Sequence, residues 1–225
     1  MRKPFIIAAV SAAIALAQAA TAADLPVKAP SAPAAAPYYN WSGFYLGGQF
    51  GYLWGRTRVE ENGVVTDPGA KTNGAIGGLL AGYYWQTGPY VFGLEADVSW
   101  TNAHGTGATS APPPNTYDIN WNSHGRGIFG YALNNWLLYI AGGVAVADFA
   151  FHEGGLPTVR GAKYVGGSIG AGTQVLFTPN FVGRLEYLYD DYGSKTYDTG
   201  GDIYRVRLTG QTVRGALIWQ FGSRP

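Results

Sequence analysis

The chain has 225 residues and a formal net charge of +1, and 13% of its residues are charged while 15% are aromatic. A soluble domain carries about 25% charged residues, so this composition fits a wall that faces lipid better than a surface that faces water. The absence of cysteine excludes disulfides, thiolate metal ligands and a lipidated cysteine, and the near-zero charge gives no reason to expect nucleic acid as a partner.

The first 22 residues predict a signal peptide. Two basic residues, Arg2 and Lys3, precede an apolar run over 5–17, and a small-x-small motif follows at 20–22. These are the parts of a secretory signal, and we expect cleavage before Ala23. The apolar run is shorter than the roughly 20 residues of a transmembrane helix, which argues against the alternative of a helical membrane anchor.

A segment rich in proline and alanine follows over 23–40. Proline lacks a backbone N–H and fixes φ, so neither a helix nor a strand is expected there. We interpret the segment as an extended periplasmic tether, and a plain disordered tail is the physically similar alternative. The folded domain is expected over 41–221, followed by a short overhang at 222–225.

Alternation of apolar and polar residues begins after Trp41 and recurs in eight segments. Turn-like or polar stretches separate the segments, which is typical of antiparallel strands. Most segments are longer than the about 9–11 residues with which a tilted strand crosses a bilayer. The segments are 42–55, 72–86, 89–102, 118–131, 136–151, 163–177, 180–193 and 204–221.

The connections between these segments alternate in length. Three are short and four are longer: 87–88, 132–135 and 178–179 against 56–71, 103–117, 152–162 and 194–203. Short turns on one side and long loops on the other are typical of outer-membrane barrels. The sequence therefore predicts an all-β fold, an eight-stranded antiparallel up-and-down transmembrane β-barrel in the bacterial outer membrane. Both termini are expected in the periplasm and the long loops outside.

Within the segments, large apolar side chains share one face, and polar or small residues share the other. In 89–102, aromatic and aliphatic residues at even positions alternate with Glu95 and Asp97 at odd positions. In 118–131, the polar side chains expected on the inward face are Asn120, Asn122, His124 and Arg126. The buried face of a soluble sheet has no reason to carry these charges, so the apolar face is expected to meet lipid.

Tryptophans indicate two membrane interfaces. On the predicted topology, four lie at the periplasmic ends of strands and three at the outer ends: Trp41, Trp85, Trp136 and Trp219 against Trp54, Trp100 and Trp121. Trp41 precedes its strand, whereas the other six lie on the predicted lipid face. Indole favours the interface between lipid and water, so we interpret the seven as two aromatic girdles. The alternative is a set of core tryptophans in a soluble β protein.

Charged residues on the inward face predict a network inside the barrel. They are Glu95, Asp97, Arg126, Arg184, Glu186 and Arg214. An unpaired charge in a narrow lumen would be costly, so partners of opposite charge are expected. Our hypothesis is that four of them close the pore: Glu95, Glu186, Arg126 and Arg214. A water path is the alternative, because inward glycines would leave some room at Gly47, Gly51, Gly166, Gly170 and Gly172.

No arrangement of residues in the sequence predicts catalysis or a cofactor. Ser123 and His124 are neighbours in one segment and should point to opposite faces of the wall, too far apart to act as a pair. The adjacent acids Asp190 and Asp191 would suit a divalent cation, although a solvated rim is the plainer interpretation. We therefore expect no enzyme activity, no cofactor and no resident metal.

Basic residues gather near the predicted outer rim, where the phosphates of lipopolysaccharide would lie. Guanidinium and ammonium groups form charge-assisted hydrogen bonds with phosphates. The candidate contacts are Arg56, Arg58, Arg160, Lys163, Arg205 and Arg207. Outer-membrane lipid and lipopolysaccharide are therefore the expected partners, and the sequence leaves the oligomeric state open.

Several motifs resemble a known family, the alphaproteobacterial outer-membrane immunogenic proteins, which are small porin-family proteins with an OmpA-like barrel. The similar stretches are 24–30, 41–48, 82–86, 92–97, 139–145 and 184–187. The resemblance spans nearly the whole chain and implies an outer-membrane location, a contribution to envelope integrity and surface antigenicity. Family members often have polar residues where this chain has Leu80 and Tyr84. They usually end on an aromatic residue that resembles the signal for the outer-membrane assembly machinery, whereas here four residues follow Phe221.

Three functions are compatible with these features. The first is a structural outer-membrane barrel with a plugged lumen, which contributes to envelope integrity. The second is a small porin-like channel for ions or small solutes. The third is binding of a ligand or a host surface by the loops, or catalysis there. The inward charges favour the first function, and the inward glycines keep the second open.

Overall fold

Eight strands make up the described part of the chain, which covers residues 39–106, 116–152, 159–198 and 203–221 of a computed structural model. The expected signal peptide, most of the expected tether and the overhang at 222–225 lie outside these residues. The strands are β1 (Gly43–Glu61), β2 (Val64–Thr87), β3 (Tyr90–Thr106), β4 (Thr116–Leu133), β5 (Trp136–His152), β6 (Val159–Thr178), β7 (Phe181–Asp198) and β8 (Ile203–Gln220). Among the described residues, no helix has the length and hydropathy needed to cross a membrane.

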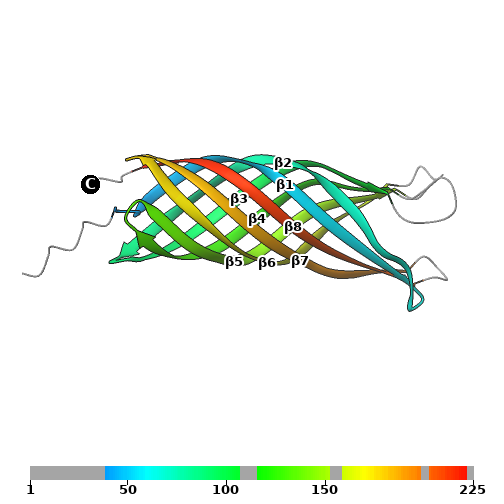
Figure 1. The fold of residues 1–225 in the computed structure, drawn as a ribbon. Coiled ribbons are helices and arrows are strands. Elements are labelled where there is room, and N and C mark those ends of the chain that lie inside the picture. Colours follow the sequence, from blue (N-terminus) through cyan, green and yellow to red (C-terminus); the bar gives the residue numbers. More distant parts are fainter. Residues whose placement is uncertain (1–38, 107–115, 153–158, 199–202, 222–225) are drawn as a thin grey trace, which may run out of the picture. The chain divides into compact units, whose positions relative to one another are not determined.

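The strands close into a barrel in which each strand is antiparallel to both neighbours, and β8 pairs with β1 to complete the ring (Figure 1). Closure leaves no free edge, so the backbone groups of each strand find partners on both sides, as hydrocarbon requires. The strands hold from 17 to 24 residues, about twice the 9–11 needed to cross a bilayer. The eight-stranded antiparallel barrel predicted from the alternation is confirmed.

One end of the barrel carries tight turns, and we call it the short-turn end. Its connections lie between β2 and β3, β4 and β5, and β6 and β7. Two of these turns contain a residue with positive φ, Gly88 at 59° and Asn134 at 54°. Glycine and asparagine tolerate this left-handed region, which allows the chain to reverse within two residues. The short connections therefore lie where the sequence predicted them.

The opposite end, which we call the hairpin end, differs from the prediction. Residues 56–71 were expected to form a loop, but β1 and β2 continue through most of this range and meet at a two-residue turn. Asn62 and Gly63 form that turn with φ values of 51° and 82°, the combination that a type I′ hairpin needs. The strands flanking the other three long connections also extend beyond their predicted bounds. The alternation of short and long connections remains, but paired strands replace much of the expected loop.

The outside of the barrel is apolar, and its inside is polar at mid-height. Large hydrophobic side chains point outward all round the wall; for example, Phe44, Leu94 and Ile169 are 67%, 60% and 65% exposed. Charged side chains such as Glu95 and Arg126 are only 4% and 3% exposed because they face the interior. This inverted arrangement is the one expected of a barrel whose outer surface meets lipid.

Because of a β-bulge in β4, one side chain points to the opposite face from the one predicted. Asn120 was expected to point inward, but it is exposed. The pairing of β4 with β5 shifts between Ile119 and Trp121, so Asn120 is the extra residue. A bulge breaks the period of two, and as a result Ile119 takes an inward position.

The interior of the barrel is layered along its length. An apolar cluster lies toward the short-turn end and includes Trp41, Tyr45, Leu80, Tyr84, Val91, Leu137, Tyr139, Val182 and Ile218. A second cluster lies toward the hairpin end and includes Leu53, Ile76, Ile119, Phe149, Tyr164, Tyr192 and Leu208. Along β3, β4, β7 and β8, the buried charged residues lie in sequence between members of these two clusters. Each end of the charged region is therefore covered by packed apolar side chains.

Candidate functional site

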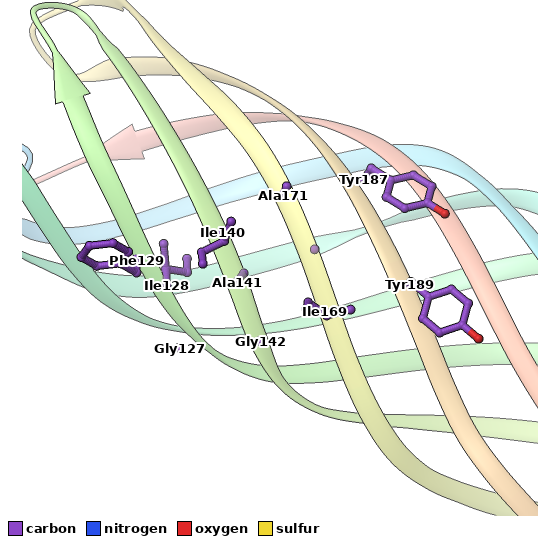
Figure 2. Close-up of a pocket in the computed structure, with 11 residues that line it drawn as sticks. Gly127, Ile128, Phe129, Ile140, Ala141, Gly142, Ile169, Ala171, Tyr187 and Tyr189 are labelled. Atoms are coloured by element: carbon purple, nitrogen blue, oxygen red, sulfur yellow. The ribbon is translucent and has the colours of Figure 1, made fainter.

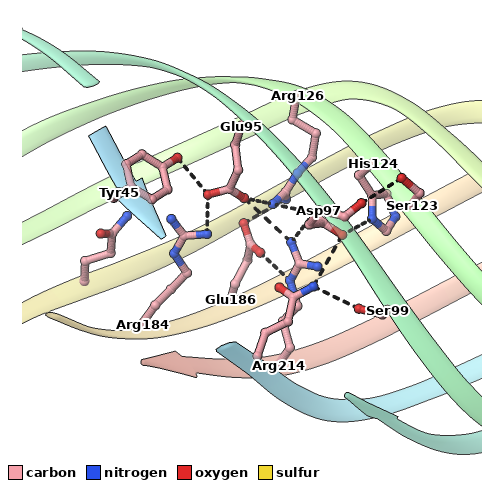
Figure 3. Close-up of polar contacts among 12 residues, drawn as sticks. Tyr45, Glu95, Asp97, Ser99, Ser123, His124, Arg126, Arg184, Glu186 and Arg214 are labelled. Carbon is pink, nitrogen blue, oxygen red and sulfur yellow. Dashed lines mark hydrogen bonds and ion pairs between the residues drawn. The ribbon is translucent and has the colours of Figure 1, made fainter. Parts of the chain in front are cut away.

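Eight ionisable side chains meet inside the barrel between the two apolar clusters, and we call them the charged belt. Figure 3 labels all of them except Asp190. All are at most 5% exposed. They project from β3 (Glu95, Asp97), β4 (His124, Arg126), β7 (Arg184, Glu186, Asp190) and β8 (Arg214). The structure thus brings together the six lumen residues named from the sequence and adds His124 and Asp190 to them.

Arg126 is the central cation of the belt. Its Nη1 donates a hydrogen bond to Glu186 Oε1 at 2.9 Å, and its Nη2 donates to Glu95 Oε1. The same Nη2 lies 3.4 Å from Asp97 Oδ2. Glu95 is the cross-strand neighbour of Arg126, whereas Glu186 reaches it from β7. One guanidinium therefore ties adjacent and distant parts of the wall together.

Two further arginines extend the belt. Arg214 donates from Nε to Glu186 Oε2 at 2.7 Å and from Nη2 to Asp97 Oδ2 at 3.1 Å. Arg184 places its Nη1 2.6 Å from Glu95 Oε2. Each of the three carboxylates therefore faces at least two guanidinium groups. Arg126 and Arg214 each direct two donors at carboxylate oxygens, whereas Arg184 donates a hydrogen bond to Tyr84 and forms an ion pair with Glu95.

His124 and Asp190 continue the belt toward the hairpin end. The imidazole Nδ1 lies 2.9 Å from Asp97 Oδ1, and Nε2 lies 3.4 Å from Asp190 Oδ2. A carboxylate can only accept from each ring nitrogen, and both nitrogens donate only in the protonated imidazole. With His124 protonated, four cations face four carboxylates, so the belt is electrically balanced.

Hydroxyl and amide groups surround the belt. On its short-turn side, Tyr45 donates to Glu95 Oε2 at 2.8 Å, and the Tyr84 hydroxyl accepts from Arg184 Nη2 at 3.0 Å and from Gln174 Nε2 at 2.6 Å. The rings of Tyr45 and Tyr84 stack with their centroids 4.5 Å apart. The family resemblance singled out Leu80 and Tyr84 on β2 as unusually apolar. The ring of Tyr84 covers this side of the belt, and its hydroxyl group faces the belt.

The inward glycines do not leave the room that the sequence suggested. A Cβ atom at Gly51 would lie 2.2 Å from the Val213 carbonyl oxygen, and one at Gly166 would lie 2.0 Å from the Asp191 carbonyl oxygen. At the remaining three positions, Gly47, Gly170 and Gly172, a Cβ atom would lie 2.5–2.8 Å from both a side-chain atom and a carbonyl oxygen of the neighbouring strands. Glycine occurs at these positions because the neighbouring strand or its side chains approach closely. The glycines mark crowding rather than a water path.

Trp41 differs from its predicted place in an aromatic girdle, because it is fully buried in the apolar cluster at the short-turn end. Its backbone N–H donates to Gln86 Oε1 at 2.6 Å, and its carbonyl oxygen accepts from Gln220 Nε2. The residue precedes β1, so the strand alternation that directs the other tryptophans outward does not apply to it. Tyr39 packs edge-on against its ring, with centroids 5.2 Å apart.

The other six tryptophans lie on the outer face. Five are 45–56% exposed and Trp121 is partly exposed. Trp85, Trp136 and Trp219 lie near the short-turn end, whereas Trp54, Trp100 and Trp121 lie several residues inside their extended strands. The two rings of indoles therefore enclose an apolar zone, and the hairpin end projects beyond the second ring.

A groove of about 580 Å³ runs across β4, β5, β6 and β7 on the outside of the barrel (Figure 2). The small residues Gly127, Gly142 and Ala171 lower its floor between larger side chains such as Ile140 and Tyr187. It belongs to the apolar outer face and does not lead to the charged belt.

The basic residues predicted at the rim fall into separate places. Arg56 and Arg58 lie on β1 beside Arg205 and Arg207 on β8, and all four are exposed. Lys163 is exposed on β6, with β7 between it and this group. Arg160 also lies on β6, and its side chain is outside the part that the structure describes. The six candidates therefore do not form a single cluster.

The paired acids considered for a cation are separated by the wall. Asp190 is buried beside His124, whereas Asp191 faces outward, 2.6 Å from Arg207. Ser123 likewise points away from His124 and donates to the Asp97 carbonyl oxygen at 2.7 Å. Within the described residues, no group of three or more histidine, aspartate or glutamate side chains has the arrangement of a metal site.

Comparisons with known proteins give a family and named relatives. The profile of a family described as "Outer membrane protein beta-barrel domain" matches residues 5–221. The 22 kDa outer membrane protein of Rhizobium leguminosarum bv. viciae is 36% identical over 162 residues, which cover 72% of this chain and 69% of that protein. The 25 kDa outer-membrane immunogenic protein of Brucella abortus is 30% identical over 210 residues, which cover 90% of this chain and 91% of that protein. The crystal structure of Neisserial surface protein A aligns with a TM-score of 0.47 at 12% identity, over 80% of this chain and 98% of that one.

Proposed function

Because the chain belongs to the outer membrane protein β-barrel domain family, we propose that it is a structural barrel of the bacterial outer membrane with a closed lumen. The observation that carries the proposal is the charged belt, in which buried cations and carboxylates contact one another across the interior. A diffusion channel needs a continuous column of water along the same axis. Here, side chains occupy that axis in three successive layers.

The contacts across the lumen give the closure its strength. Arg126 on β4 reaches Glu186 on β7, and Arg214 on β8 reaches Asp97 on β3, so both pairs join strands that are not neighbours. Opening a water path would separate such pairs inside a narrow, poorly solvated space. Breaking one buried pair costs about 3–5 kcal/mol. This cost favours a structural role over passage of ions or small solutes.

For its orientation, the proposed barrel has the short-turn end in the periplasm and the hairpin end at the cell surface. Short periplasmic turns and longer outer connections are general for bacterial barrels. The extension of the strands beyond the ring of Trp54, Trp100 and Trp121 supports this orientation, because it lifts the hairpins away from the apolar zone. Surface hairpins of this kind would be the parts that antibodies reach, in keeping with the immunogenic names of the relatives.

The orientation is tested by labelling single cysteines in whole cells. The chain has no cysteine of its own, so Val64→Cys at the hairpin end and Thr87→Cys at the short-turn end each introduce one thiol at an exposed position. A large maleimide that does not enter the periplasm should label Val64→Cys in intact cells and should leave Thr87→Cys unlabelled. Both variants should react once the outer membrane is permeabilised, which controls for thiol reactivity. Labelling of Thr87→Cys alone in intact cells would show that the proposed orientation is reversed.

The closed lumen is tested by the ion current through the refolded protein in a planar bilayer. The proposal predicts that correctly inserted wild-type barrels carry no steady single-channel current. Catalysis is not part of the proposed function, because the residues considered for it point to opposite sides of the wall, as Ser123 and His124 do.

A further inference from the structure

Five cations form a strip on the outer face of three adjacent strands, and we call it the basic strip. It consists of Lys71 on β2, Arg56 and Arg58 on β1, and Arg205 and Arg207 on β8. Lys71 is the cross-strand neighbour of Arg56, and Arg58 is the cross-strand neighbour of Arg207. Directly opposed residues of an antiparallel pair project from the same face. All five side chains are exposed, so the strip presents its charge to the surroundings of the barrel.

The strip holds more positive charge than the protein itself neutralises. Arg58 lies 3.4 Å from Glu60, and Arg207 lies 2.6 Å from Asp191. Within the part of the chain that the structure describes, no ion pair joins Arg56, Lys71 or Arg205 to a carboxylate. Like charges directly opposite each other destabilise a strand pair. An arrangement that opposes Arg58 to Arg207 and Arg56 to Lys71 is therefore favoured when an anion lies among them.

The opposite wall of the barrel has the reverse character at the same end. There, Asp118 on β4 and Asp148 on β5 are partly exposed, and His104 lies 2.6 Å from Asp118. Of the described cations at this end, Lys163 on β6 and Lys195 on β7 stand apart, whereas the five of the strip gather on β8, β1 and β2. This asymmetry indicates a local anion site.

The position of the strip along the wall identifies the class of anion. Arg56 follows Trp54 by two residues on the same outward face, and below it the wall presents Tyr52, Phe50 and Val213, which are 42%, 64% and 40% exposed. A ligand at this height has its charge beside the arginines and its hydrocarbon against the aromatic wall. Free phosphate would use only the upper half of this surface, whereas a phosphorylated lipid uses both halves.

We propose that the basic strip binds the phosphate groups of lipopolysaccharide in the outer leaflet, with its acyl chains against the apolar wall beneath Trp54. Arginine suits this role because its planar donor fork matches phosphate oxygens. The strip includes Lys71, which the sequence prediction did not contain, and excludes Lys163. In the cell, the strip meets lipopolysaccharide only if the hairpin end lies at the surface, so this part of the proposal rests on the proposed orientation.

The test is a titration of lipopolysaccharide into the purified full chain in neutral detergent. Replacing Arg56 and Arg205 with glutamine removes two charges that form no ion pair in the described structure, so the fold should be unaffected. Neutral glutamine forms none of the charge-assisted hydrogen bonds that an arginine donates to phosphate, so the double variant should bind at least tenfold more weakly. The matched control replaces Lys163 and Lys195 with glutamine. These two cations lie outside the strip, so the control variant should bind lipopolysaccharide as the wild type does. Equal loss in the control would overturn the site in favour of general charge attraction.

Two further ligands identify what the strip recognises. Lipopolysaccharide from which the phosphates have been removed should bind the wild type no better than it binds the Arg56→Gln, Arg205→Gln variant. Inorganic phosphate alone should show no saturable binding, and binding as tight as that of lipopolysaccharide would overturn the lipid assignment. These titrations do not depend on orientation in the cell. A reversed barrel would be detected by the Val64→Cys labelling while the binding in detergent persisted.

Discussion

Replacing Arg126 with methionine is expected to lower the free energy of unfolding by about 3–5 kcal/mol, the cost of leaving buried charges without their partner. The guanidinium of Arg126 contacts Glu95, Asp97 and Glu186, and these side chains are at most 4% exposed. Methionine has a similar volume and leaves little cavity, so the loss reports on charge. The measurement is urea-induced unfolding in lipid vesicles, followed by circular dichroism.

A surface pair provides the matched control for Arg126. Arg58→Met removes a guanidinium 3.4 Å from Glu60 at the exposed hairpin end, and the change should stay within about 1 kcal/mol. Adding Glu186→Gln to Arg126→Met removes one charge of each sign, and the double variant should lose less than the two single variants together. A small effect of Arg126→Met, equal to that of Arg58→Met, would contradict the view that the belt holds the barrel together.

Replacing Trp41 with alanine is expected to have a comparable effect, about 3–5 kcal/mol, as for other fully buried large aromatic residues. Its indole is fully buried in the apolar cluster that covers the short-turn side of the belt. The alanine variant leaves a void beneath Tyr39, which packs against the indole edge. Because Gln86 and Gln220 bind only the backbone of Trp41, their hydrogen bonds should survive, and the loss reports on packing.

The control for Trp41 is Trp136→Ala on the outer face at the same end, where the side chain is 45% exposed. It removes the same atoms from a position that is only partly covered by protein, so its loss of stability should be clearly smaller. Equal losses for the two variants, measured by the same unfolding in vesicles, would show that Trp41 is not part of the packed interior.

The alternation in the sequence was sufficient to predict the barrel and its two faces, because a strand that divides lipid from lumen must change polarity at every residue. It failed where that division ends. Beyond Trp54 the outward face leaves the apolar zone, so outward residues such as Arg56 and Arg58 are polar and the segment resembled a loop, although its inward face stays buried at Thr57. The Asn62-Gly63 pair was the local signal for a hairpin, and its positive φ values explain that choice of residues.

For the charged belt, the alternation predicted which side chains point inward but not which of them touch. Parity along the strands placed the arginines and glutamates inside, and the same parity includes His124 with Arg126, and Asp190 with Glu186. Asp190 was instead assigned to a rim with Asp191, because the strand was expected to end nearby. Which charges touch across the lumen depends on the register of distant strands, and a single sequence does not contain that information.

Residues outside the regular strand pattern were the least predictable. Trp41 precedes β1, so no alternation directs its side chain, and composition alone favoured an interface girdle. Inward glycines suggested space, but Gly51 faces a neighbouring backbone too close for any Cβ. Asn120 was misplaced by a bulge that shifts the register by one residue. Each of these differences concerns packing between strands rather than the identity of the strands.

The central claim, that the three interior layers close the lumen, is tested most directly by single-channel recording of the refolded wild-type protein in a planar bilayer. Folding is verified by the resistance of the barrel to unfolding in detergent before it is added, and insertion is verified in the bilayer itself by the fluorescence of a label on the Val64→Cys variant. The closed barrel predicts silent insertions with no reproducible current step. Steady openings of uniform conductance in the wild type would contradict closure and would show that water passes beside Arg126 and Glu186 rather than being excluded by them.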